Sequence, residues 1–137
     1  MEECDFIYGK CFYYQKKYNK ALTCFYDICQ NKESPFFYDS VLFSARSYFL
    51  MQKFNEAIPL YEYIILHGNV YQKNDYVESL KKLVICYNNT GNKSKTEKLL
   101  AKINKEELGL ETFEQLENIN NSVLADYYQA KKIKQCF

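Results

Sequence analysis

The sequence has 137 residues, of which 47% are apolar, so it is long enough for one domain with a sizeable core and too apolar to be disordered. Its formal net charge of +1 excludes the strongly basic composition that is typical of nucleic-acid-binding domains. Its apolar runs are too short for a membrane span, and its acidic first residues are unlike a secretory signal. The sequence therefore predicts a cytoplasmic protein, or a nuclear one in a eukaryote.

Apolar residues recur at spacings of three and four along most of the chain, which predicts amphipathic helices packed in antiparallel pairs. Only four glycines and two prolines interrupt this pattern, so few positions can break a helix. The first pair of helices is predicted within residues 3–34, the second within 35–70 and the third within 75–104. The aromatic residues expected in their shared core are Tyr8, Phe12, Tyr18, Phe25, Tyr48, Phe54 and Tyr61.

Local signals predict where three of these helices begin. Ser34-Pro35 places a capping residue before a first-turn proline, so a helix is expected to start there. Asp75 with Glu78 has the spacing of a capping box, which predicts the start of the third pair. Ser94 with Glu97 has the same spacing and predicts the start of the second helix in that pair.

A final helix is predicted over residues 112–134, where apolar residues again follow a helical period and Thr112 with Gln115 can cap the start. In a stack in which each pair buries only its neighbours, the last pair needs a helix with a polar outer side to close the core. Residues 1–137 are therefore predicted to form a single all-α domain, a solenoid of about seven antiparallel helices.

The predicted pairs also match one another in sequence. Lys17-Tyr18-Asn19-Lys20-Ala21 matches Lys53-Phe54-Asn55-Glu56-Ala57 at a distance of 36 residues. Small residues at Gly9 and Ala45 stand where the two helices of a unit approach closely, although Val84 replaces the small residue in the third unit. Two helices in a period slightly above about 34 residues are typical of tetratricopeptide repeats. The sequence resembles a tetratricopeptide-repeat (TPR) domain with three repeats and a C-terminal helix.

The residue types that carry catalysis or bind metals are scarce in this sequence. The six cysteines form no C-x-x-C pair and His67 is the only histidine, so no structural zinc site is expected. The four glycines lie far apart, which excludes a glycine-rich phosphate loop. His67 falls at the end of a predicted helix, where an imidazole interacts favourably with the terminal carbonyls. We expect no cofactor and no enzymatic activity.

The resemblance to TPR domains implies a concave groove lined by the first helix of each unit. Tyrosine and phenylalanine together number 24, more than the repeat core requires, and such residues are enriched where proteins meet. The expected partner is a protein or peptide with apolar anchors and an acidic group that faces Lys10, Arg46 or Lys81. The residues predicted to line the groove are Phe6, Lys10, Tyr13, Leu42, Arg46, Phe49, Leu50, Lys81, Ile85 and Asn88, with Asn89 beside them.

Three functions fit these expectations. The first is a scaffold or adaptor subunit of a larger protein assembly, similar to the TPR subunits of the anaphase-promoting complex. The second is a small chaperone that holds a segment of its partner, as in type III secretion, and the third is a regulatory domain that senses a peptide. The first repeat has no helix before it in this sequence. Either the chain is a fragment of a longer repeat protein, or this repeat is expected to be covered by a neighbouring subunit or by a second copy of the chain in a homodimer.

Overall fold

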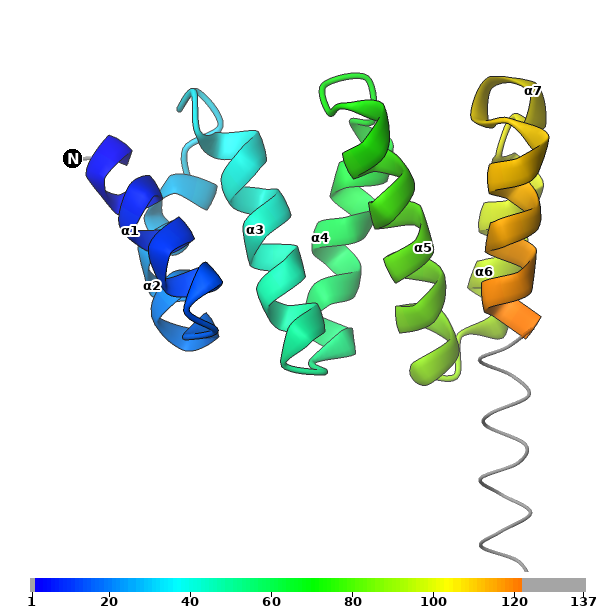
Figure 1. The fold of residues 1–137 in the computed structure, drawn as a ribbon, viewed down its shortest axis with the longest axis horizontal. Coiled ribbons are helices and arrows are strands. Elements are labelled where there is room, and N and C mark those ends of the chain that lie inside the picture. The colour runs from blue at the N-terminus through cyan, green and yellow to red at the C-terminus, as the bar shows by residue number, and fades with distance from the viewer. Residues whose placement is uncertain (1, 122–137) are drawn as a thin grey trace, which may run out of the picture.

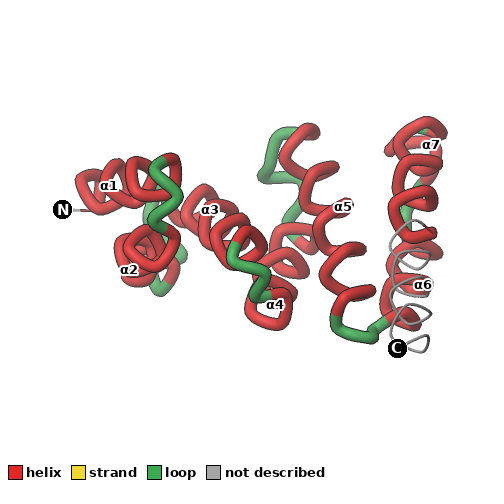
Figure 2. The backbone as a smooth tube through the Cα atoms, turned by 60° about the horizontal axis from the view of Figure 1, so that its bottom comes forward, coloured by secondary structure: helices red, strands yellow, loops and turns green. Residues whose placement is uncertain are grey.

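A computed structural model of the chain describes residues 2–121, and these residues form an all-helical solenoid without strands (Figure 1). Successive helices run antiparallel and form two layers, with α1, α3, α5 and the helical residues 110–121 in front of α2, α4 and α6 in Figure 1. We call these layers the first-helix face and the second-helix face. Figure 2 shows the same helices joined by short loops. The helices are α1 (Glu2–Tyr14), α2 (Tyr18–Cys29), α3 (Phe37–Leu50), α4 (Phe54–Leu66), α5 (Lys73–Asn89), α6 (Lys93–Lys102) and α7 (Lys105–Leu108).

The two helices of the first unit approach closely because Gly9 has no side chain. A Cβ atom placed at Gly9 would lie 2.5 Å from the ring of Phe25 on α2, which is closer than such atoms pack. In the second unit Ala45 and Ala57 are fully buried between α3 and α4. The small residues predicted at Gly9 and Ala45 therefore lie where helices pack against each other.

The turn between the two helices has the same geometry in all three units. One residue in each turn adopts a left-handed conformation, with φ of 63° at Lys16, 60° at Gln52 and 75° at Gly91. Each turn is closed by a backbone bond that spans five residues, the pattern of a Schellman motif. The closing bonds are Lys17 N to Phe12 O (2.8 Å), Lys53 N to Tyr48 O (2.9 Å) and Asn92 N to Tyr87 O (2.7 Å).

The core of the described residues consists of three clusters, and each cluster joins one helix pair to the first helix of the next. Phe25 and Ile28 of α2 pack with Phe43 of α3 in the first cluster. Tyr61 of α4 is fully buried in the second, which reaches α5. Leu116 of the last helix closes the third cluster. Because each cluster buries only neighbouring helices, the chain is stabilised unit by unit, as in other solenoids.

The observed helix starts differ from the predicted ones. α3 begins at Phe37 instead of Pro35, because Ser34 accepts a hydrogen bond from the Phe36 N–H (3.2 Å) in a turn before the helix. α5 begins at Lys73 and α6 at Lys93, and neither helix is capped by a side chain. The capping boxes predicted at Asp75 and at Ser94 are therefore wrong.

The C-terminal part of the solenoid contains one element that the sequence analysis did not predict. The short helix α7 precedes the last helix, and Asn104 caps it by accepting hydrogen bonds from the N–H groups of Glu106 and Glu107 (3.0 and 3.4 Å). The last helix begins at residue 110, two residues before the predicted start. The predicted continuation of this helix to residue 134 lies outside the described residues.

One aromatic residue predicted in the core is exposed instead. Tyr8 is 61% exposed, because the buried side of α1 contains Phe6 and Gly9 and Tyr8 points away from it. Phe25 and Tyr61, by contrast, are fully buried as predicted.

Candidate functional site

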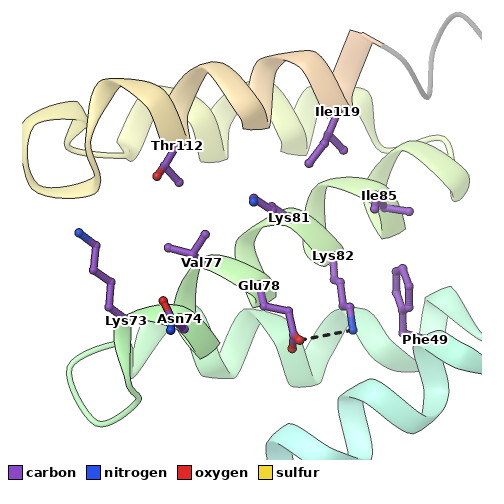
Figure 3. Close-up of a pocket in the computed structure, with 10 residues that line it drawn as sticks. All are labelled: Phe49, Lys73, Asn74, Val77, Glu78, Lys81, Lys82, Ile85, Thr112 and Ile119. Carbon is purple, nitrogen blue, oxygen red and sulfur yellow. Dashed lines mark ion pairs between the residues drawn. The ribbon is translucent and has the colours of Figure 1, made fainter.

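A groove of about 550 Å³ opens on the first-helix face between α5 and residues 110–121, beside the C-terminal end of α3 (Figure 3). Thr112 and Ile119 point from the last helix toward Val77, Lys81 and Ile85 on α5. Clefts of this size are typical of sites that enclose a small ligand or a few side chains of a peptide. The groove is lined by Phe49, Lys73, Asn74, Val77, Glu78, Lys81, Lys82, Ile85, Thr112 and Ile119.

The apolar part of the groove comes from three helices. Phe49 lies at the end of α3, Val77 and Ile85 lie two turns apart on α5, and Ile119 faces them from the last helix. Val77 and Ile119 also pack against the third core cluster. Within residues 2–121, Ile85 is half-buried and belongs to none of the three clusters, so it is the apolar residue of the groove with the least structural role.

Three lysines and one glutamate give the groove a positive charge. Lys82 lies 3.8 Å from Glu78 and 5.1 Å from the centre of the Phe49 ring, and burial lowers the pKa of Lys82. Lys81 donates a hydrogen bond to Gln115 on the last helix (2.9 Å). Lys73 is exposed and forms no ion pair within residues 2–121. Lys73 and Lys81 are therefore the cations with which an acidic ligand can interact.

Arg46, which was expected to face a partner, is occupied within the protein. Its Nε donates to Glu78 (2.8 Å) and its Nη2 donates to Asp75 (3.1 Å), so it joins α3 of the second unit to α5 of the third. The guanidinium also lies 5.2 Å from the centre of the Phe43 ring, and the side chain is only 15% exposed. Arg46 is a structural residue of the interface between two units.

The predicted residues of the first unit lie around a buried ring. Phe6 is 8% exposed and packs against Phe43, so it belongs to the core instead of the groove. Lys10 covers the rings of Phe6 and Phe43 at 5.3 and 5.8 Å, and Tyr13 contacts Phe43 edge-on at 5.1 Å. Leu42 is 2% exposed and is likewise a core residue.

The remaining predicted residues lie near the ends of their helices. Asn88 donates to Asn120 (2.6 Å) and accepts from Thr96 (3.1 Å), so it links α5 to α6 and to the last helix. Asn89 donates to the backbone carbonyl of Ile85 and is exposed. Leu50 is 45% exposed at the end of α3.

Phe49, Lys81 and Ile85 are thus the predicted residues that the structure brings together in the groove. Sequence reasoning missed Val77, although it lies one turn before Lys81 and two turns before Ile85 on the same side of α5 and could have been found from that spacing. It also missed the contribution of Thr112 and Ile119, because nothing in the sequence tells which side of the last helix faces α5.

The side chains that bind metal ions are not gathered in the described part of the chain. Residues 2–121 contain no group of three or more histidine, cysteine, aspartate or glutamate side chains able to hold a metal ion. His67 is the C-cap residue that follows α4, and its Nδ1 lies 3.0 Å from the carbonyl oxygen of Tyr63, as expected of a histidine at a helix end.

None of the helices within residues 2–121 combines the length and the apolar character that crossing a bilayer requires.

No protein-family model, no curated protein and no solved structure matches this chain. Its function is therefore inferred from the side chains of the groove.

Proposed function

We propose that this chain is a TPR-type protein–protein interaction module without enzymatic activity, which serves as a scaffold or adaptor subunit of a larger assembly in the cytoplasm or, in a eukaryote, the nucleus. An anaphase-promoting-complex-like TPR subunit is one model for this role. The supporting observation is the groove between α5 and residues 110–121, where an apolar surface lies next to Lys73 and Lys81. This combination suits a protein segment better than a membrane or a nucleic acid.

The bound segment is expected to carry an apolar anchor and an acidic group. The anchor contacts Ile85 and Val77, which gain most from losing contact with water. The acidic group interacts with Lys73 and, once its hydrogen bond to Gln115 is exchanged, with Lys81. The anchor supplies most of the affinity, whereas the lysines favour acidic sequences over basic ones.

Selection from a random peptide library displayed on phage tests this proposal with a defined ligand. The selected peptides should share an apolar residue next to Asp or Glu, and their affinity is measured by fluorescence polarisation. Ile85→Gln should weaken binding about tenfold, the loss expected when one buried apolar anchor is removed. Leu110→Gln is the matched control, because Leu110 is 71% exposed in the last helix and does not line the groove. If the selected peptides bind both variants as tightly as the wild type, the groove is not their site.

Two alternatives use the same groove and differ in the partner. A small chaperone of the type III secretion kind would hold one long segment of a single partner, and a regulatory domain would sense a short free peptide. A shortened version of the selected ligand separates these alternatives, because a peptide sensor retains affinity for a few residues whereas a chaperone loses it.

Self-association through the first unit is a second part of the proposal, and the exposed side of α1 supports it. Ile7, Tyr8 and Tyr14 are 52%, 61% and 69% exposed, and the exposed Cys4 and Cys11 share this side of the helix. The N-terminal end of α1 is acidic, with Glu2, Glu3 and Asp5, while lysines follow its C-terminal end. Two copies paired antiparallel along α1 would therefore bring opposite charges together.

Light scattering on the purified chain tests the dimer. The mass of two chains is expected at tens of micromolar, and Tyr8→Lys should convert it to the mass of one chain. A wild-type chain that remains monomeric at these concentrations would rule out self-association.

A further inference from the structure

A second hollow lies on the second-helix face, opposite the groove. It has a volume of about 680 Å³ and lies between α4 and α6. Its apolar residues include Ile65 and Leu66 at the end of α4, and Leu66 is 79% exposed. Its other side carries lysines, because α6 presents Lys95, Lys98 and Lys102 toward it. Ile65 is half-buried against the core, whereas Leu66 remains exposed beside these lysines.

The charges around this hollow are unbalanced. Among residues 2–121, Glu62 is the only acidic residue that lines it, against three lysines on α6. Within residues 2–121, none of these lysines takes part in an ion pair. Lys95 lies 6.0 Å from the centre of the Tyr87 ring, and all three lysines are exposed. The hollow therefore combines exposed apolar area with free positive charge at its edge.

We propose that this hollow binds an acidic amphipathic helix of a partner protein. Lys95, Lys98 and Lys102 follow one another at spacings of three and four on one side of α6, over about 10 Å of helix. Carboxylates at the same spacings on a helix laid alongside α6 meet all three lysines. Its apolar side then covers Ile65 and Leu66, since a helix packs well onto the surface between two others.

This second site goes beyond the proposed function of the groove and does not depend on it. The two sites lie on opposite faces, so one molecule can hold two partners at the same time. A nucleic acid would also meet the three lysines, but its phosphate backbone leaves the apolar residues uncovered, and Leu66 in particular would contribute nothing to its binding.

The probe for this site is a labelled synthetic peptide of about 15 residues, the length at which isolated helices begin to form. Its leucines recur at a helical period so that they share one side of the helix, and glutamates lie beside that side. A scrambled peptide of the same composition is the control. Binding is measured by fluorescence polarisation at moderate salt, with a single-stranded oligonucleotide as competitor. Amide chemical shifts of the isotope-labelled protein locate the site.

The designed peptide is expected to bind in preference to its scrambled form and to shift amides in α4 and α6. The exposed variants L66E and K95E/K98E/K102E should each weaken binding about tenfold. The three exposed ion pairs contribute about twofold each, and Leu66 contributes a similar total by losing its contact with water. L110E is the matched control for L66E, since Leu110 is similarly exposed outside the hollow. Circular dichroism verifies that each variant stays folded.

Several results would overturn this inference. Equal binding of the scrambled peptide, or full competition by the oligonucleotide, would show that the lysines attract any polyanion. Binding that L66E leaves unchanged, or the absence of saturable binding, would show that the hollow takes no apolar helix. Loss of binding in I85Q with shifts confined to α5 and residues 110–121 would place the peptide in the groove instead.

Discussion

Replacing Arg46 by glutamine should destabilise the protein, because this side chain connects the second unit to the third. It forms two charge-assisted hydrogen bonds, to Glu78 at 2.8 Å and to Asp75 at 3.1 Å, and it lies over the Phe43 ring. Exposed ion pairs contribute about 0.2–1 kcal/mol, whereas breaking a buried one costs about 3–5 kcal/mol. Arg46 is 15% exposed and its two partners about a third, so a loss of about 2 kcal/mol is expected.

Urea unfolding followed by circular dichroism measures this loss as a change in the free energy of unfolding. For a chain of this size the same loss lowers the melting temperature by about 6–8 °C. Lys98→Gln is the control, because that lysine is exposed and unpaired within residues 2–121, and its change should remain within about 0.5 kcal/mol. A double-mutant cycle of Arg46→Gln with Glu78→Gln should give a coupling of about 1 kcal/mol. A stability equal to that of the wild type, or a coupling of zero, would mean that Arg46 is free in solution and available to a partner.

Three further predictions concern single side chains. Gln52→Gly should stabilise the protein by about 0.5–1 kcal/mol, because glycine adopts a φ of 60° without strain. Lys53→Gly is the control, and it should destabilise the protein because Lys53 has an ordinary negative φ. Equal effects of the two substitutions in urea unfolding would contradict this prediction. Tyr61→Phe should leave stability unchanged or raise it, because the buried Tyr61 hydroxyl has no hydrogen-bond partner within residues 2–121, and a loss above about 1 kcal/mol would reveal one. Burial raises the pKa of Cys86 to about 12, so at pH 8 only about one thiol in ten thousand is ionised. Alkylation, mapped by mass spectrometry, should therefore reach Cys86 only when the protein unfolds. Labelling of Cys86 as fast as that of the exposed Cys4 would refute its burial.

The repeating part of the fold was predictable because it depends on local sequence. The match between Lys17–Ala21 and Lys53–Ala57 places the second helix of each unit, and in the structure Ala21 and Ala57 are both fully buried. Gly9 signalled a close approach of helices because only glycine fits against an aromatic ring at that distance. These signals act within one unit, where sequence spacing determines which side chains share a helix face.

The role of Arg46 was not predictable, because its partners belong to the next unit. Asp75 and Glu78 have the spacing of a capping box, but the same spacing places both carboxylates on one side of a helix. Gln72 precedes α5, so the two carboxylates lie within the helix and bind Arg46 across the interface. The packing of α3 against α5 determines that these two carboxylates bind Arg46 and do not cap the helix.

The candidate groove was predicted only in part, because sequence spacing shows which residues share a side of a helix but not whether a neighbouring helix covers that side. Lys81 and Ile85 share a side of α5, and the helical period is enough to place them together. Phe6 and Leu42 fit the period equally well, but they lie on the sides of α1 and α3 that the neighbouring helices cover. Which side of a helix remains open depends on how successive units are rotated, and that rotation is a property of the packed solenoid.

The central proposal is that the groove between α5 and residues 110–121 binds a protein segment with an apolar anchor and an acidic group. Its most direct test is an amide chemical-shift titration of the isotope-labelled protein with a peptide selected from the random library. The proposal predicts saturable shifts centred on Val77, Lys81, Ile85 and Ile119. Shifts confined to the first unit, or a selected peptide that moves no amide of α5, would contradict it.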